Sequence, residues 1–260
     1  MYLKLLEALA INPSPSLTSL ELVNIMAIPD SLYSREDLFA IFRPLKKLEI
    51  AAIRGDCRDA SLEGESDGTF EVEGTYTDPQ LVAEFWDTIV PSVVRRATAL
   101  TSLTLRTNQW IGGHPAMSFK DIFLPQLSEL VLQKFHLEPV DPDYDIVQFV
   151  IRHKATLTRL DLRHCAIGCW YNDQGWRSWH AVFTTFAMEL GKLTEFVFLA
   201  FTDDEEEDEF GEQGARFLYS HSLGSADYEI AELDEDVVEG DRPAFEHLQR
   251  LVLARKSPGS

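Results

Sequence analysis

A six-residue pattern, here called the hexad, recurs along this 260-residue chain, with leucine at its first and fourth positions and leucine or isoleucine at its sixth. The fourth and sixth positions of each hexad are apolar and lie on the same side of an extended chain, which predicts a short strand with one buried face. A further match, LEALAI (6–11), is expected to be helical from its context. Recurrence of this kind favours an architecture of stacked units. The hexads are LTSLEL (17–22), LKKLEI (45–50), LTSLTL (100–105), LSELVL (127–132), LTRLDL (157–162) and LQRLVL (248–253), with an aromatic variant, LTEFVF (193–198).

Segments with apolar residues at helical spacing separate the predicted strands. The clearest covers 81–94 and follows Asp78 and Pro79, a capping side chain and a proline suited to the first helical turn. Pro91 is expected to kink or end this helix. Strand and helix therefore alternate, which is the order of an α/β fold with a parallel sheet. Further helices are predicted over 38–42 (with Ser34 as the cap), 146–150 and 176–190.

Two hexads extend into a longer pattern. The one at Leu100 continues to Asn108 as L-x-x-L-x-L-x-x-N, and the one at Leu157 continues through Cys165 to Ile167. These residues resemble the leucine-rich repeat family. The resemblance implies one solenoid domain over residues 1–260, a curved parallel sheet with helices on its convex side and irregular repeats. Prolines before several strands, uneven unit lengths and the stretch 152–165 are similar to the repeat arrays of fungal F-box proteins.

The likeness to F-box proteins implies a function without catalysis. It implies a protein-interaction scaffold, the substrate-recognition region of a ubiquitin ligase, with a protein partner on the concave face and no cofactor. In that family a helical F-box precedes the repeats, whereas the first predicted strand here begins at Leu17. We therefore expect the F-box to be absent from this chain, and a ligase adaptor to be a partner only if an F-box lies upstream.

The charge of the chain is strongly negative and uneven. The net charge is −20, and most of the excess lies in two acidic insertions, 56–78 and 203–241. The second holds 16 acidic residues and one basic residue, and it is expected to be disordered. The alternatives are that it attracts basic partners or that it folds onto the arginine-bearing face of the same chain. Such a charge disfavours nucleic acid and anionic membranes as partners.

The acidic insertions also suggest two other functions. Leucine-rich repeats joined to acidic tracts resemble acidic nuclear regulators of the histone-chaperone type. They also resemble the Ran GTPase-activating proteins, which would make this chain a regulator of a small GTPase. In both groups the acidic tract follows the last repeat, whereas LQRLVL follows it here. That difference weakens both resemblances.

Signals for catalysis and metal binding are weak. Three cysteines without framework spacing indicate a reducing, intracellular compartment, cytoplasmic or nuclear. No nucleophile elbow or phosphate-binding loop is present, so no enzymatic activity is expected. Cys165 and Cys169 lack a second ligand pair, and Cys165 is interpreted as a buried structural thiol rather than a zinc ligand. The histidines considered with them are His153, His164 and His180.

Two groups of residues are candidate binding sites. Alternation along the strands places polar residues on the concave face, where arginines could hold a carboxylate of an acidic partner through paired hydrogen bonds. An ordinary mixed-charge sheet face is the alternative. Near Trp179, an aromatic cluster is either packing or an exposed anchor for a partner. The concave-face residues are Arg106, Gln133, Arg159, Asp161 and Arg163, and the anchor residues are Trp170, Tyr171 and Trp176.

Overall fold

The computed structural model describes residues 2–12, 17–53, 78–112, 115–137, 142–169, 177–199, 217–222, 228–230 and 238–256. The strands are β1 (Ser19–Met26), β2 (Lys47–Ile53), β3 (Ser102–Thr107), β4 (Glu129–Gln133), β5 (Arg159–Arg163), β6 (Ala166–Cys169), β7 (Glu195–Leu199), β8 (Leu218–Ser222) and β9 (Tyr228–Ile230). The helices are α1 (Tyr2–Ile11), α2 (Glu36–Phe42), α3 (Pro79–Glu84), α4 (Val90–Arg96), α5 (Ile146–Arg152), α6 (Trp179–Glu189) and α8 (Asp241–Lys256). Short 3₁₀ turns cover Ser31–Ser34 and Pro142–Tyr144, and a π turn covers Phe85–Ile89.

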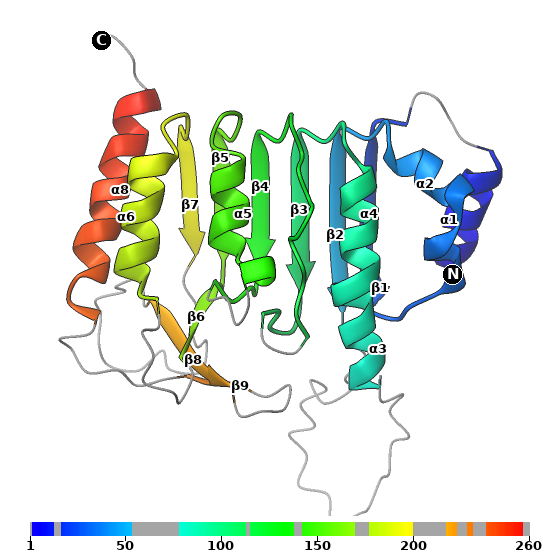
Figure 1. Cartoon of the computed structure of the whole chain (residues 1–260), viewed down its shortest axis with the longest axis horizontal. Helices are drawn as coiled ribbons and strands as arrows, with labels where there is room; N and C mark the ends of the chain where they lie inside the picture. The colour runs from blue at the N-terminus through cyan, green and yellow to red at the C-terminus, as the bar shows by residue number, and fades with distance from the viewer. Residues whose placement is uncertain are drawn as a thin grey trace, which may run out of the picture.

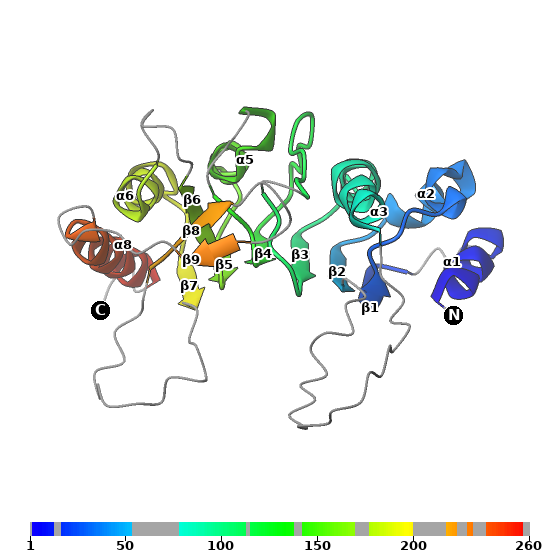
Figure 2. The same cartoon turned by 90° about the horizontal axis from the view of Figure 1, so that it is seen from below.

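Six parallel strands form the main sheet, in the order β1-β2-β3-β4-β5-β7 (Figure 1). This confirms the prediction of an α/β fold with a parallel sheet. Each strand begins at the third residue of its hexad, so the hexads align from strand to strand. Leu48, for example, lies between Leu20 and Leu103 in the register. Figure 2 shows α2, α3, α5 and α6 on one face of this sheet, with α1 and α8 at its two ends.

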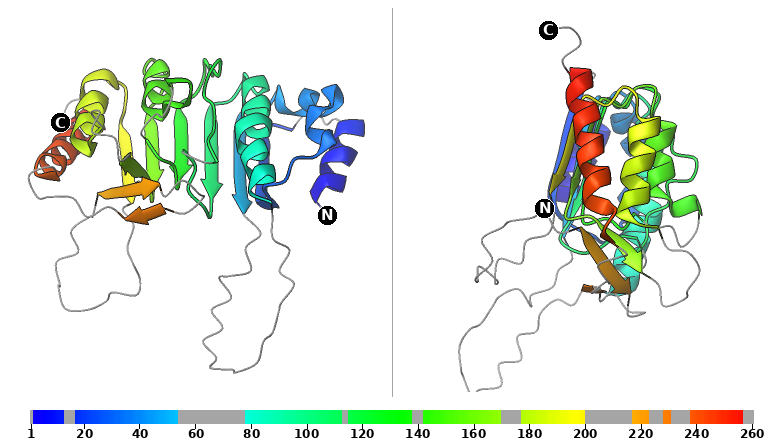
Figure 3. Two further views of the ribbon diagram at one scale, coloured as in Figure 1. Left: turned by 60° about the horizontal axis from the view of Figure 1, so that its bottom comes forward. Right: turned by 90° about the vertical axis from the view of Figure 1, so that its left-hand side faces the viewer.

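The seventh predicted strand is wrong. LQRLVL (248–253) lies in helix α8, which packs against α6 at the β7 end of the sheet (Figures 1 and 3). The hexad also satisfies helical spacing, because Leu248 and Val252 are four residues apart and both are buried. Leu253, which a strand would have pointed inward, is 64% exposed. The choice between strand and helix was therefore made by packing.

The predicted helix over 81–94 is present as an uninterrupted run of α3, a π turn and α4. The Asp78 carboxylate accepts a hydrogen bond from the Gln80 N–H, as expected for a cap. Pro91 does not end the helix. It lacks an N–H, and just before it the Val90 N–H bonds to Phe85 O, five residues back, which widens the helix locally.

The cap predicted for the helix over 38–42 is also corrected. The residue at the start of α2 is Arg35, not Ser34, and its side chain makes no capping hydrogen bond. Arg35 instead pairs with Asp37, with Nη2 and Oδ2 2.5 Å apart, in the first turn of α2. The other two predicted helices correspond to α5 and α6.

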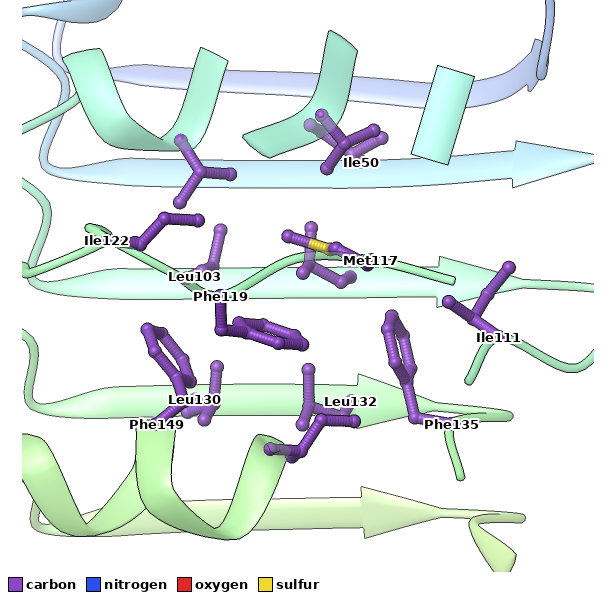
Figure 4. Close-up of a cluster of buried hydrophobic side chains, with 14 of the residues drawn as sticks. Ile50, Leu103, Ile111, Met117, Phe119, Ile122, Leu130, Leu132, Phe135 and Phe149 are labelled. Atoms are coloured by element: carbon purple, nitrogen blue, oxygen red, sulfur yellow. The ribbon is translucent and has the colours of Figure 1, made fainter. Parts of the chain in front are cut away.

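The core lies between the main sheet and the helix layer. The leucine and isoleucine side chains at the fourth and sixth hexad positions of β2 to β5 are buried there, as at Leu103 and Leu130. Between β3 and β4 the described residues form no helix, and an extended segment takes its place in the layer. Its buried side chains, including Met117 and Phe119, fill the gap over the sheet (Figure 4).

Hydroxyl side chains link successive units at the edge where the strands begin, here called the amino edge. The second residue of each hexad from LTSLTL to LTEFVF is Thr or Ser, and its hydroxyl donates to the carbonyl of the equivalent residue in the preceding unit. The four bonds run from Thr101 to Lys46 O (3.0 Å), Ser128 to Thr101 O (3.0 Å), Thr158 to Ser128 O (3.1 Å) and Thr194 to Thr158 O (3.3 Å).

A second, smaller sheet has the order β6-β8-β9. It adjoins turns at Lys134 and His164, where the backbone adopts positive φ. Just after each turn, isolated β-bridges pair the chain with a neighbouring segment. Strands β8 and β9 lie inside the acidic segment 203–241, so the expectation of disorder is wrong for 217–222 and 228–230.

Candidate protein-binding surface

One face of the main sheet, here called the open face, is covered by no helix among the described residues (Figure 2). Its side chains alternate with the buried leucines and therefore point away from the helix layer. The register aligns them in three rows across the strands. The rows are Ser19, Lys47, Ser102, Glu129, Arg159 and Glu195; Glu21, Glu49, Thr104, Val131, Asp161 and Val197; and Val23, Ala51, Arg106, Gln133, Arg163 and Leu199.

The five predicted concave-face residues all lie on this open face. Three of them form a cluster, in which the buried carboxylate of Asp161 contacts Arg159 and Arg163. Asp161 is fully buried, and Arg163 meets it with two hydrogen bonds, Nε to Oδ1 at 2.9 Å and Nη2 to Oδ2 at 2.8 Å. Arg159 approaches from the other side, with Nη2 3.6 Å from Asp161 Oδ2. The hydrogen bond to Asp161 raises the pKa of the Arg163 guanidinium, which keeps it charged.

Two arginines of the open face also pair with acids on neighbouring strands. Arg106 Nη1 lies 3.3 Å from Glu49 Oε1, and Arg159 Nη1 lies 3.0 Å from Glu195 Oε1. With five acidic and four basic residues in its three rows, the face has a net charge of −1. The arginines expected to hold a carboxylate of an acidic partner are thus each in contact with an acid of the chain itself, and binding of such a partner through them stays a prediction.

Other residues of the open face have unused binding capacity. Gln133 is half-buried, and Glu21 and Lys47 are exposed; none of the three has a side-chain hydrogen bond or ion pair to a described residue. Val23 and Leu199, at opposite ends of the third row, are 50% and 44% exposed. Alternation along the strands predicts that both lie on this face, but their apolar character by itself is typical of a core position and does not indicate exposure.

The aromatic anchor predicted at Trp170, Tyr171 and Trp176 lies outside the described residues. Their neighbour Trp179 is fully buried, and its Nε1 donates to Leu218 O at 3.0 Å. Trp179 therefore belongs to the core between α6 and β8.

The residues considered for zinc have other contacts. Burial raises the pKa of the Cys165 thiol to about 12, so this thiol stays protonated. His153 is buried, with Nδ1 2.8 Å from Phe149 O, and Nε2 accepts the Leu124 N–H at 3.0 Å. In the part of the chain that the structure describes, no three His, Cys, Asp or Glu side chains gather as metal ligands would.

Comparison with known proteins places the chain in no group. No family model matches it, and no curated protein matches it with significance. Among the described residues, no helix has the length and apolar character needed to cross a membrane.

Proposed function

We propose that this protein is a non-enzymatic, intracellular leucine-rich repeat scaffold that receives a partner protein on its open face. In its specific form it is the substrate-recognition region of an F-box-like protein. Six hexads in a common register and the hydroxyl bonds between units support a solenoid, in which each unit is stabilised by its neighbours. The strands follow an arc in Figure 2 with the open face on its inner side, which supports a concave binding face.

The observation that carries the proposal is the uncovered open face with exposed apolar side chains at both ends. Val23 on β1 and Leu199 on β7 are separated by five strand intervals, roughly 24 Å at about 4.8 Å per interval. Between them lie charge pairs that are already neutralised and a half-buried Gln133 with free hydrogen-bonding groups. Such a surface fits a partner segment lying across the strands, with apolar contacts at its two ends.

The test uses a bulky substitution at the centre of the open face. Gln133→Trp blocks the face without breaking an ion pair, and Glu246→Trp, at an exposed position of α8, is the control. Proteins captured from cells by the wild-type chain are purified and their affinities for all three chains measured. We expect at least tenfold weaker binding to Gln133→Trp only.

The two levels of the proposal are tested separately. Equal affinity of every captured partner for Gln133→Trp and for the wild-type chain would overturn the binding role of the open face. The F-box form depends on an F-box upstream of this chain, because we expect this chain to contain none. Coding sequence upstream of Met1 that encodes an F-box supports this form, whereas a gene without one retains the scaffold and rejects the F-box form.

A second candidate is an acidic leucine-rich repeat regulator that binds basic proteins. The sequence alone weakened this candidate, because LQRLVL follows the acidic tract. That hexad lies in α8, so the tract follows β7, the last strand of the main sheet. Residues 54–77 follow β2 and residues 200–216 follow β7, so both acidic stretches leave the sheet at the edge where its parallel strands end.

A basic peptide tests this second candidate. A labelled oligolysine peptide is titrated into the full chain and into a variant whose acidic residues over 203–212 are replaced by serine and glutamine. If the acidic tract binds basic proteins, the variant binds more weakly and with a smaller salt dependence. Equal binding at low salt would rule this candidate out.

A further inference from the structure

An aromatic side chain is exposed on the helix side of the molecule. Phe123 lies in the segment that replaces a helix between β3 and β4, and it is 59% exposed. Its ring stacks on that of His153, with centroids 5.6 Å apart and planes at 20°. His153 is itself fixed by its bonds to Leu124 N–H and Phe149 O. Phe123 is therefore an exposed ring on a rigid support, which costs little conformational entropy to bury in an interface.

Two arginines flank the same segment from opposite sides. Arg95, from α4, donates to Lys120 O at 3.2 Å, and Arg152, from α5, donates to Phe119 O at 3.0 Å. Because the two acceptors are consecutive carbonyls, both guanidinium groups are held at one short stretch of chain. Neither forms an ion pair with an acidic residue among those described. Each keeps most of its N–H donors for another acceptor, in contrast to Arg163 on the open face.

A second exposed apolar side chain lies at the end of α6. Lys154, just after α5, donates through Nζ to Glu189 Oε2 at 2.7 Å, and Met188, which precedes Glu189 in the sequence, is 71% exposed. Helices α4, α5 and α6 all end at the amino edge (Figure 1). Basic residues at helix C-termini are expected because they offset the helix dipole. The dipole gives no reason for Phe123 and Met188 to be exposed there.

We propose that Arg95, Phe123, Arg152 and Met188, here called the amino-edge surface, dock an acidic amphipathic segment of a partner protein. Carboxylates of the partner bind the two free guanidinium groups, and its apolar side chains cover Phe123 and Met188. A protein segment fits this surface better than nucleic acid, because Asp121 lies in the segment that the arginines contact and Glu189 lies next to Met188, and both would repel a continuous row of phosphates. This surface is separate from the open face and does not depend on its function.

A synthetic peptide of alternating glutamate and leucine, labelled with fluorescein, tests the proposal by fluorescence anisotropy against the full chain. Two variants remove the two kinds of contact: Phe123→Ser, which leaves the charge unchanged, and Arg95→Gln with Arg152→Gln, which keeps hydrogen-bonding groups. We expect each to weaken binding at least fivefold. The control is Arg242→Gln with Arg250→Gln on the exposed side of α8, which removes the same charge and should leave affinity unchanged.

Three results would overturn the proposal. The first is no binding of the peptide to the wild-type chain up to millimolar concentration. The second is an equal loss of binding in the α8 control, which would indicate attraction by charge alone. The third is a labelled DNA duplex that binds as tightly as the peptide and responds to the same variants. Urea unfolding of each variant establishes that a loss of binding is not a loss of folding.

Discussion

At the scale of single residues, Asp161 is the most constrained charge on the open face. Its neighbours in the same row are Val131, which is 9% exposed, and Val197, which is half-buried, so Asp161 is more buried than either. A buried carboxylate is costly unless cations and hydrogen bonds compensate for it, and Arg159 and Arg163 provide both. The two arginines are about one-third exposed, so either could reach water if Asp161 were absent.

This asymmetry predicts unequal costs for breaking the cluster. Replacing both Arg159 and Arg163 with alanine leaves a buried carboxylate without a cation, and we expect a loss of about 3 kcal/mol in the free energy of unfolding. Asp161→Val, which continues the valine row, should cost about 1 kcal/mol or less. Urea unfolding at neutral pH measures both. A larger cost for Asp161→Val than for the double variant would contradict this account.

Buried histidines make the fold sensitive to acid. Burial lowers the pKa of His136 to about 3, and it also lowers the pKa of His153. A histidine whose pKa is lower in the folded state binds fewer protons there than in the unfolded chain. The folded state therefore has its full stability above the unfolded pKa of about 6.5 and loses stability as the pH falls below that value.

For His136 this loss is about 2 kcal/mol at pH 5, relative to neutral pH. His136→Gln removes the titrating group and keeps a partner for the Ser220 hydroxyl, which lies 3.3 Å from His136 Nε2. The unfolding free energy of this variant should depend less steeply on pH between 7 and 5 than that of the wild type. Parallel pH profiles for the two chains would show that His136 is not the source.

At the scale of elements, α8 shows how one sequence can satisfy two periodicities. As a strand, LQRLVL would bury Leu248, Leu251 and Leu253. As a helix it buries Leu248 and Val252 and leaves Leu253 exposed. The helix is favoured by an aromatic cluster beyond β7, where Phe245 of α8 contacts Phe183, Phe196 and Phe198. Burial of these rings and of Leu248 outweighs the hydrogen bonds that a seventh strand would make.

Two leucines within the hexad test the helix. Leu248→Ala should cost about 3 kcal/mol of unfolding free energy, as expected for a fully buried leucine. Leu253→Ser should change stability by less than about 0.5 kcal/mol, because this side chain is mostly exposed. Thermal or urea unfolding gives both values. A comparable cost at the two positions would indicate a strand instead.

At the scale of the whole molecule, charge divides the chain into two parts. The described residues hold 20 basic and 20 acidic side chains, whereas the remaining residues hold 3 basic and 23 acidic ones. The described part is therefore neutral, and the entire net charge of −20 belongs to the rest of the chain. Because the folded state holds this excess charge in a smaller volume than the unfolded chain does, self-repulsion destabilises it.

Salt should therefore stabilise the protein. Raising NaCl from about 0.02 to 0.15 M shortens the screening length to about 8 Å and should raise the unfolding free energy, on the order of 1 kcal/mol. Replacing the seven acidic residues 203–209 with serine changes the net charge from −20 to −13 and should reduce this gain. A salt effect of the same size in both chains would place its origin in the ion pairs of the described part.

The sequence alone determined the six strands of the main sheet and their register. Strand and burial follow from a period of two within a few residues, and the hexads repeat that local signal at each unit, as at Leu103 and Leu130. It also placed Arg106, Gln133, Arg159, Asp161 and Arg163 on one face, because alternation fixes the side to which each side chain points. These are properties of neighbouring residues along the chain.

Only the tertiary structure decided how those residues are used. Whether an arginine is free or paired depends on which acid the next strand brings beside it, as Glu195 is brought to Arg159, and no local pattern encodes that distance. Whether LQRLVL forms a strand or a helix depended on the aromatic side chains of α6 and β7. The exposure of Phe123 depended on the support beneath its ring. Each outcome is set by contacts between residues far apart in the sequence, where competing conformations differ by only a few kcal/mol.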